Sequence, residues 1–339
     1  MPKLSIIVPF YKAEKYVKKC IDSILNQSFK DFELIVINDA SPDNTLLILK
    51  EYQSIDSRIK IINHTNNLGV AEARNSGLKV SNGDYIGFVD QDDWIHEDMY
   101  ENLIKSALIN KADIVECNYE ENGFSVLEDM PNKFPYDILN INDYIILLYK
   151  NRLSLALWNK IYKTESIKNN NIFFIDHKKV EAEDLLFNLE IFNENKVINI
   201  INKNYYHHTI HSESLSFHKI ENYLQKTDNL INEYTSAIKN SINYKKILHS
   251  FSLLILIKIR GILFQALIQD EKHISSATKE LSKASKNIII NKAALNCIFN
   301  KNTKLIDRII ALLFHLKFYA VLSFIYYLKI KIRKDIRLK

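Results

Sequence analysis

The sequence predicts an α/β fold, in which a mostly parallel sheet carries helices on both faces, followed by a helical C-terminal region. Over about 120 residues at the front, short runs rich in Ile and Val alternate with amphipathic stretches, a pattern typical of alternating strands and helices. Four of the six glycines fall within residues 69–87, and no proline follows Pro135. The front is therefore rich in turns and the back in long helices. Strand–helix alternation implies a sheet covered on both sides.

Five short apolar runs predict the strands. They cover residues 4–10, 32–39, 58–64, 84–90 and 113–119. Apolar residues at helical spacing predict the helices between them, over residues 13–27, 44–53, 71–81 and 96–110. Ser41 and Asp43 occupy positions typical of the cap of the second helix.

The chain is less regular after these elements and then becomes helical. We expect a connection from residue 122 that contains a helix at 141–149, and a mixture of short elements over 151–217. Beyond about residue 220 the spacing of apolar residues predicts helices throughout.

Two of the C-terminal stretches, 251–267 and 305–334, are strongly apolar. Lys258, Arg260 and Lys317 interrupt the apolar runs before about 18 residues accumulate, so neither stretch predicts a clean transmembrane span. The N-terminus runs straight into a strand pattern without a small-residue cleavage site, which predicts no signal peptide.

The composition is that of a folded globular protein, with 47% hydrophobic and 25% charged residues. A net charge of only +5 argues against a nucleic-acid partner. Cys20, Cys117 and Cys297 are too far apart for metal-ligand spacing and odd in number, so they predict no disulfide framework and fit a reducing cytoplasm.

Acidic residues follow two of the predicted strands. Asp39 ends the second, and Asp90, Asp92 and Asp93 follow the fourth. Ligands of open α/β sheets bind at the carboxyl ends of the strands, and two carboxylates spaced D-x-D there suit Mg²⁺ or Mn²⁺ together with substrate phosphates. An isolated D-x-D would more commonly be a solvated acidic turn, and we expect Asp93 to start the following helix.

Two long stretches carry a family resemblance. Residues 4–45 and 67–94 resemble the nucleotide-sugar-binding half of family 2 glycosyltransferases, which have the Rossmann-like GT-A fold. Several motifs of the family occur in the right order, and this combination identifies the family far more specifically than any single motif. The resemblance continues more weakly through 156–162, 181–187 and 205–216, as in bacterial surface-polysaccharide enzymes.

The resemblance implies a division of the chain into three parts. Residues 1–121 would form the nucleotide-sugar-binding half of the GT-A domain and residues 122–217 its acceptor-binding half. Residues 218–339 would form a helical C-terminal region that is not covered by the resemblance.

The resemblance also implies a uridine site at the front of the chain. Pro9 and Tyr11 would shape the loop against which the uracil packs, and Asp39 would recognise the base. Asn38 departs from the acidic pair common in the family, and Lys12 replaces a frequent asparagine.

The rest of the donor site follows from the same resemblance. Arg74 would contact the base or the diphosphate, although a surface arginine of a helix is nearly as common. Asp90 would bind the ribose or the sugar, and Asp92 would ligate Mn²⁺ or Mg²⁺. Asn75 and Gly77 are expected to serve helix–sheet packing.

An acceptor hydroxyl needs a base, which the resemblance places in the second part. Asp184 is the expected catalytic base, and its neighbour Glu183 is expected at the acceptor or diphosphate; the alternative is that Glu183 caps or decorates the helix. Trp158 and Lys160 resemble residues near the acceptor or diphosphate. His208, in a His207-His208-His211 cluster whose spacing does not predict zinc, could contact the diphosphate.

The C-terminal segment is basic as well as apolar. From residue 306 onward, eight Lys or Arg face two acids, a net charge of +6, which leaves about −1 for the first 305 residues. Such a segment predicts a peripheral contact of residues 305–339 with an anionic membrane, on the inner face of the cytoplasmic membrane. An internal helix with a solvated tail and a homodimer are alternatives.

The resemblance implies an inverting, metal-dependent glycosyltransferase. It would move a hexose or N-acetylhexosamine from a UDP-sugar to a saccharide or lipid-linked saccharide acceptor during the synthesis of bacterial capsule, lipooligosaccharide or a related glycan. The alternative is a non-catalytic nucleotide-sugar-binding or scaffold protein of the same fold. A nucleotidyltransferase is disfavoured because no phosphate-binding glycine motif follows the first strand.

Overall fold

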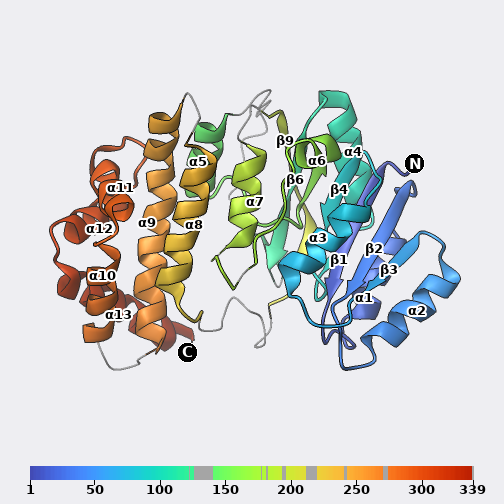
Figure 1. The fold of residues 1–339 in the computed structure, drawn as a ribbon, viewed down its shortest axis with the longest axis horizontal. Helices are drawn as coiled ribbons and strands as arrows, with labels where there is room; N and C mark the ends of the chain where they lie inside the picture. The colour runs from blue at the N-terminus through green and yellow to red at the C-terminus, as the bar shows by residue number, and fades with distance from the viewer. Residues whose placement is uncertain are drawn as a thin grey trace. The chain divides into compact units, whose positions relative to one another are not determined.

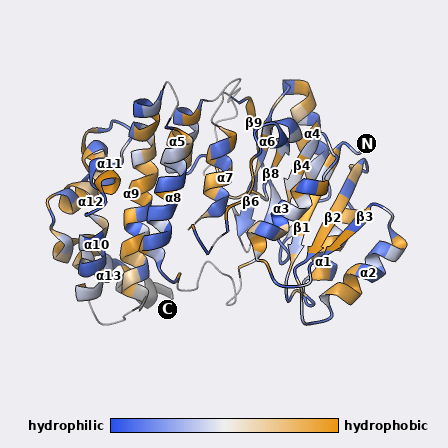
Figure 2. Cartoon of the chain, viewed as in Figure 1, coloured by the Kyte–Doolittle hydropathy of each residue, from blue (hydrophilic) through white to orange (hydrophobic). Residues whose placement is uncertain are grey.

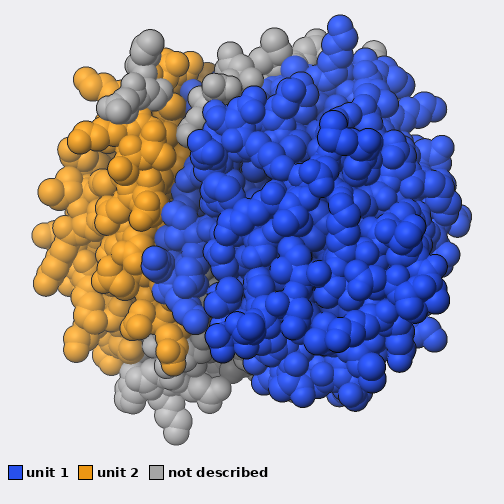
Figure 3. All heavy atoms as spheres, turned by 45° about the vertical axis from the view of Figure 1, so that its right-hand side comes forward, with its two compact units in different colours: residues 1–144, 150–212 blue, residues 145–149, 213–339 orange. Residues whose placement is uncertain are grey.

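The computed structural model separates into two compact units, which Figure 3 colours differently. The first contains residues 1–144 and 150–212, and the second residues 145–149 and 213–339. The described residues are 1–121, 123–125, 140–176, 178–180, 182–192, 196–210, 220–239, 243–269 and 274–337, with the backbone alone described for 268–269 and 331–337.

The first unit is built on one sheet. Its strands are β1 (Leu4–Phe10), β2 (Phe32–Asn38), β3 (Ile59–Asn63), β4 (Tyr85–Phe88), β5 (Trp94–Ile95), β6 (Ile114–Glu121), β7 (Phe124–Ser125), β8 (Lys160–Lys163) and β9 (Ile198–His208). Their order is β3-β2-β1-β4-β8-β6-β9-β5, with β7 paired to β6. The first four strands in this order are parallel, and β8 is antiparallel to both β4 and β6.

The helices of this part follow the predicted alternation (Figure 1). They are α1 (Val17–Leu25), α2 (Thr45–Ile55), α3 (Val70–Val80), α4 (Met99–Asn110), α5 (Ile141–Tyr149), α6 (Thr164–Lys168) and α7 (Glu183–Ile191). The central strands β1 and β2 are buried along their whole length and are hydrophobic in Figure 2. Strands buried on both faces read as continuous apolar runs, which is why the sequence predicts them well.

The two faces of β1 pack against different helices. Ile6 and Val8 belong to one core with Ile21 of α1. Successive side chains of a strand point to opposite faces, and Ile7 meets α3, where a Cβ added to Gly77 would lie 2.5 Å from its Cγ2. The expected packing role of Gly77 is confirmed.

The parallel register brings the expected acids to one edge of the sheet. Phe10 of β1 pairs with Asn38 of β2, and Ile7 of β1 pairs with Phe88 of β4. The segments that follow these strands, with Asp39 and Asp90, therefore leave the sheet at its carboxyl edge.

The second unit is helical, as predicted. It contains the end of α5 and the helices α8 (Tyr223–Ala237), α9 (Tyr244–Gln269), α10 (Ile274–Ala284), α11 (Ile288–Phe299), α12 (Leu305–His315) and α13 (Tyr319–Arg337). In Figure 1, α8 lies on one side of α9 and α10, α11 and α12 lie on the other. A Cβ on Gly261 of α9 would lie 2.1 Å from the Tyr223 hydroxyl, so glycine allows α8 and α9 to approach.

One helix of this unit departs from the expectation about apolar spans. Within the described residues, Tyr244–Leu267 of α9 is long and apolar enough to cross a membrane, despite Lys258 and Arg260. About two thirds of its most apolar window, 67%, is buried inside the protein. The core helix of a soluble protein meets the same criteria, so the finding is weak evidence for a span.

Candidate functional site

Asp39 organises the loop between β3 and α3. Its carboxylate is nearly buried, at 3% exposure. One oxygen accepts from Nδ1–H of His64 at 2.7 Å and from the backbone N–H of Leu68 at 2.9 Å, and the other from the N–H of Gly69 at 2.8 Å. Gly69 has φ 90°, a backbone conformation that favours glycine. The side chain is thus held by donors of its own chain, and its contact with a base stays a prediction.

The loop after β1 is tied to the neighbouring loops. Pro9 lies buried within β1, in register with Ile37. The N–H of Tyr11 donates to Oε1 of Gln91 at 2.7 Å, and its ring is 38% exposed. Tyr11 is thus partly exposed whereas Pro9 is buried, and the contact of either residue with uracil stays a prediction.

The expected caps of α2 serve this loop as well. The N-cap residue of α2 is Asn44, so the prediction of Ser41 as a cap is wrong. The Ser41 hydroxyl instead accepts from the N–H of Lys12 at 3.3 Å. The Asp43 carboxylate accepts from the N–H of Thr45 at 3.2 Å, at the start of α2, and from the N–H of Glu14 at 3.1 Å. It therefore joins the helix start to the β1–α1 loop.

Arg74 of α3 lies among three carboxylates. Its side chain is 5% exposed. Nη1 donates to Asp184 at 2.8 Å and lies 3.5 Å from Glu183, and Nη2 donates to Asp90 at 3.1 Å. The acids expected at the donor and at the acceptor therefore meet at one guanidinium.

The charges of this cluster shift its protonation equilibria. Burial opposes the cationic form, but the charges of Asp184 and Asp90 raise the pKa of Arg74, which stays protonated. Burial raises the pKa of Asp184 to about 7, against the lowering effect of Arg74 and with a further increase from Glu183. Asp184 remains 28% exposed. A reachable carboxylate that titrates near neutral pH is suited to act as a general base.

Asp93 does not start a helix, and that expectation is wrong. It precedes the short strand β5 and is 1% exposed, whereas α4 begins at Met99. Its carboxylate accepts from the Tyr206 hydroxyl and from the N–H of Thr209, each at 2.7 Å. Burial and the charge of Asp90 raise the pKa of Asp93 to about 8. Asp93 is thus a buried link between the acidic turn and β9.

Asp92 is a partly buried member of the same turn. Among the described residues, no group of three or more His, Cys, Asp or Glu is placed to hold a metal ion. Mg²⁺ usually binds through one or two carboxylates plus substrate phosphates and water. Asp92 with a diphosphate fits such an ion without a larger cluster, and ligation by Asp92 stays a prediction.

Lys160 lies inside the protein, at 1% exposure. Its ammonium is 3.2 Å from a carboxylate oxygen of the fully buried Glu116 and donates to the carbonyls of Ser154 and Ala156 and to the side chain of Asn159. Burial lowers the pKa of Lys160 and raises that of Glu116. This lysine holds the segment before β8, and its burial contradicts the expected direct contact with the acceptor or diphosphate.

Trp158 forms an aromatic stack with β9. Its ring is 4.2 Å from that of Tyr206 and 5.4 Å from that of His208, both nearly parallel. Nδ1 of His208 lies 3.3 Å from a carboxylate oxygen of Glu121. Trp158 is 7% exposed, so packing accounts for most of its surface. Both residues keep their roles at the acceptor or diphosphate only as predictions. His211 lies outside the described residues.

Three residues of the site were not singled out from the sequence. His64 and Tyr206 bind Asp39 and Asp93, and Glu116 compensates Lys160. The available signal for Glu116 is a charged residue inside an apolar run. Its partner lies 44 positions away and on another strand, which the sequence pattern does not reveal.

Comparison with known proteins identifies the family. Residues 5–175 match the family model described as glycosyl transferase family 2. The chain belongs to this family. The uncharacterized glycosyltransferase EpsJ of Bacillus subtilis is 32% identical over 220 residues, which cover 64% of this chain and 63% of EpsJ. Poly(ribitol-phosphate) beta-N-acetylglucosaminyltransferase TarS of Staphylococcus aureus is 31% identical over 214 residues, 62% of this chain and 36% of TarS. The chain thus matches less than two thirds of the length of either relative.

Solved structures show the same fold for this family 2 chain. TarS 1–349 in complex with UDP-GlcNAc has a TM-score of 0.73 at 21% identity, covering 96% of this chain and 91% of that one. The mannosyltransferase PcManGT of Pyrobaculum calidifontis, in complex with GDP-Man and Mn²⁺, has a TM-score of 0.56 at 16% identity, covering 96% and 87%. The predicted GT-A fold with a helical C-terminal region is confirmed.

Proposed function

We propose that the protein is an inverting, metal-dependent glycosyltransferase that moves a hexose or N-acetylhexosamine from a UDP-sugar to a saccharide or lipid-linked saccharide acceptor. Membership of family 2 supports sugar transfer, and the likeness to TarS, whose structure contains UDP-GlcNAc, favours a uridine donor. The acceptor would belong to a bacterial cell-surface glycan such as capsule or lipooligosaccharide.

One observation carries the assignment of roles. Arg74 binds Asp90, at the carboxyl edge of the sheet, and Asp184, at the start of α7. The carboxylate proposed to bind the donor and the carboxylate proposed as the base therefore bind the same guanidinium and lie close together. In a direct displacement the nucleophile, the anomeric carbon and the base must be close together.

The proposed reaction is a single displacement. An acceptor hydroxyl oxygen bonds to the anomeric carbon as the bond from that carbon to the diphosphate oxygen breaks, so the configuration inverts. The hydroxyl proton passes to the carboxylate of Asp184, and UDP leaves. Arg74 keeps Asp184 oriented, and Glu183 adds negative charge beside it. A divalent ion held by Asp92 would neutralise charge on the leaving diphosphate.

A donor screen tests this proposal. The full chain is incubated with UDP-GlcNAc, UDP-glucose, UDP-galactose or GDP-mannose, with Mn²⁺, Mg²⁺ or EDTA, and thermal stabilisation and nucleotide release are measured. We expect a UDP-sugar to raise the melting temperature and to be hydrolysed slowly when metal is present. Asp92→Asn should remove the effect of metal while the protein stays folded.

The alternatives give different results in the same screen. A non-catalytic binding protein would be stabilised by a UDP-sugar but would release no UDP and transfer no sugar to any saccharide acceptor. Stabilisation by GDP-mannose alone would overturn the uridine donor, and equal binding in EDTA would overturn the metal.

A further inference from the structure

Helices α10 to α13 concentrate the positive charge of the chain. Residues 274–337 contain thirteen Lys or Arg against three acids, a net charge of +10, whereas the whole chain carries +5. Glu280 is paired with Lys283 at 2.6 Å. Asp307 is 2% exposed and is bound by the Tyr149 hydroxyl and by Arg260. Two of the three acids are therefore already paired within the protein.

Residues 319–330 of helix α13 carry apolar side chains on two opposite sides. One side is buried, through Tyr319, Leu322, Ser323 and Tyr326. Large apolar side chains occupy the opposite side at helical spacing, each between 41% and 53% exposed: Phe318, directly before the helix, and Val321, Phe324, Ile325 and Leu328. A surface helix of a globular protein typically carries polar residues on its outer face. The exposed side of α13 therefore carries apolar side chains at positions where polar side chains, which hydrogen-bond to water, are usual.

Helix α12 repeats the pattern. Its buried side carries Ile310, Ala311 and Phe314. Leu305, Ile309, Leu312 and Leu316 follow one another at spacings of four, three and four residues and are 42% to 75% exposed. Contiguous exposed apolar surface of this kind marks an interaction site.

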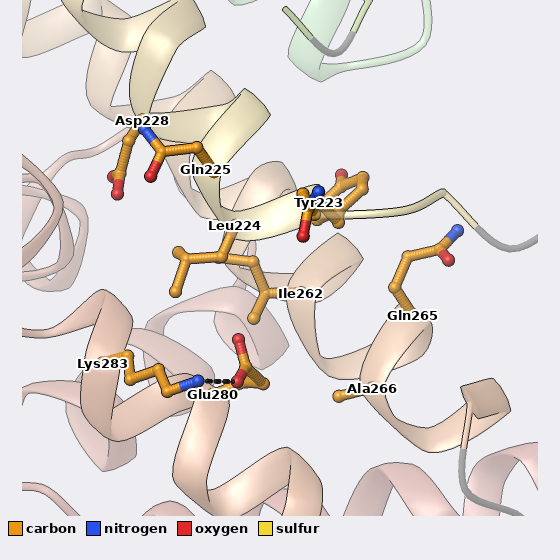
Figure 4. A pocket seen from close by; sticks show the side chains of 10 residues that line it. Tyr223, Leu224, Gln225, Asp228, Ile262, Gln265, Ala266, Glu280 and Lys283 are labelled. Carbon is orange, nitrogen blue, oxygen red and sulfur yellow. Dashed lines mark hydrogen bonds and ion pairs between the residues drawn. The ribbon is translucent and has the colours of Figure 1, made fainter. Parts of the chain in front are cut away.

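Two hollows in this unit differ in charge. A cavity of about 360 Å³ is lined by two carboxylates, Asp228 and Glu280, and Glu280 forms its ion pair with Lys283 there (Figure 4). A larger groove of about 750 Å³ lies between α10 and the start of α13. Among the described residues it is lined by three lysines, Lys279, Lys283 and Lys286, with Ser275, Thr278, Ser282 and Tyr319, and by no acid. The lining of the first hollow carries two carboxylates and one lysine, whereas the second adds the ammonium groups of Lys279 and Lys286 and hydroxyl donors.

The groove lies next to the apolar stripe of α13. Ala320, which lines the groove, is followed by Val321 of the stripe. Lys279 and Lys286 are exposed and have no ion-pair partner among the described residues. Cationic groups that can bind a phosphate thus lie next to apolar side chains, an arrangement that matches a lipid with an anionic headgroup.

We propose that α10, α12 and α13 dock the protein on the surface of an anionic phospholipid bilayer. The apolar stripe of α13, extended by that of α12, enters the boundary between headgroups and acyl chains, while Lys279 and Lys286 bind lipid phosphates. A second copy of this chain is a poorer occupant because its own helices carry the same +10 charge. The contact thus lies in the body of the helical unit and not only in the basic end of the chain.

Vesicle flotation of the full chain tests the proposal. We expect partitioning onto phosphatidylcholine vesicles to increase strongly when phosphatidylglycerol is added and to decrease with salt. Lys279→Ala/Lys286→Ala should weaken binding to the anionic vesicles about 25-fold, because each basic residue near such a surface contributes about fivefold, or roughly 1 kcal/mol. Phe324→Ser/Ile325→Ser should weaken it at least about tenfold.

Matched control variants come from the first unit. Leu108 and Ile109 are 53% and 69% exposed on α4, and Lys50 and Lys105 are exposed on α2 and α4. Leu108→Ser/Ile109→Ser and Lys50→Ala/Lys105→Ala should partition like the wild type. Circular dichroism of every variant must give the wild-type melting curve.

Three results would overturn the proposal. One is equal loss of binding in the control variants, and another is wild-type partitioning of both test variants. In the third, Phe324→Ser/Ile325→Ser turns a dimer into a monomer in sedimentation without changing vesicle binding, which would assign the stripe to a second copy. A folded chain that ends at Ile330 should still bind and still lose affinity through Lys279→Ala/Lys286→Ala.

Discussion

The guanidinium of Arg74 lies 2.8 Å from a carboxylate oxygen of Asp184, although 110 residues separate them in the chain. The same guanidinium binds Asp90 at 3.1 Å. An arginine can bridge two separated carboxylates because its donors lie on spaced nitrogens of one rigid planar group, whereas a lysine has all its donors on a single nitrogen.

Arg74→Lys should therefore reduce sugar transfer by about 100-fold or more, since misplacing a catalytic group by about 1 Å can cost that much. Steady-state transfer assays and calorimetric titration with UDP check this prediction together. We expect the rate to fall while UDP still binds. An unchanged rate would show that the bridge is not needed to orient Asp184.

The pH dependence of transfer should report the ionisation of Asp184. Burial raises its pKa to about 7, and only the ionised form can accept the hydroxyl proton. We therefore expect kcat/KM to fall about tenfold per pH unit below about pH 7 and to level off above it. Profiles from pH 5.5 to 9 measure this.

Two variants separate this effect from a general loss of folding at low pH. Asp184→Asn should abolish transfer at every pH and leave UDP binding nearly intact, whereas Glu183→Gln should retain transfer and its fall at low pH. Because the charge of Arg74 lowers the pKa of Asp184, Arg74→Met should shift the remaining profile to higher pH. A shift to lower pH would contradict the electrostatic explanation.

Removing one partner of the buried pair Glu116–Lys160 should destabilise the protein more than replacing both partners. Lys160→Met leaves a buried carboxylate without its cation, which typically costs about 3–5 kcal/mol in the free energy of unfolding. The double change Glu116→Gln/Lys160→Met should recover a large part of that loss. Both tryptophans, Trp94 and Trp158, lie in the first unit, so their fluorescence during urea unfolding measures this effect. Equal losses in the single and double variants would contradict it.

The contact between α3 and β1 predicts a further stability change. Gly77→Ala places a methyl group 2.5 Å from Cγ2 of the buried Ile7, and such overpacking typically costs about 1–3 kcal/mol. The double variant Gly77→Ala/Ile7→Ala should lose less free energy of unfolding than the sum of the losses in the two single variants. Gly83→Ala is the control, because its Cβ would meet the backbone of Ser5 and Leu4, so Ile7→Ala should not rescue it.

The sequence predicts most of the fold of the first unit for a simple physical reason. Strands such as residues 4–10 and 32–38 are buried on both faces, so their apolar runs are continuous and their ends sharp. The carboxyl edge with Asp39 and Asp90 follows from parallel topology. The side chains that bind these acids do not follow, because Arg74 and His64 approach from other elements.

The errors arise where tertiary contacts override local pattern. Asp93 precedes helix-like sequence, yet the Tyr206 hydroxyl and the N–H of Thr209 draw it into the interior. Lys160 resembles a residue near the acceptor or diphosphate, yet its ammonium lies inside the protein, 3.2 Å from a carboxylate oxygen of Glu116. The roles of Asp184 and Asp92 came from resemblance to a family, since an acidic pair at a helix start and a D-x-D turn are common by themselves.

Helix α3 has one end fixed by Asp39, through Leu68 and Gly69, and carries Arg74 little more than one turn further on. Helix α3 therefore connects two parts of the proposed site. At its start is the loop held by Asp39, the residue proposed to bind uracil, and one turn later Arg74 binds Asp184, the proposed catalytic base. A substitution that releases this loop would displace the arginine as well. A redesign that changes the nucleotide specificity would therefore have to preserve the hydrogen bonds of Asp39 to Leu68 and Gly69. Otherwise Arg74 would move, and the orientation of Asp184 towards the acceptor would change with the donor.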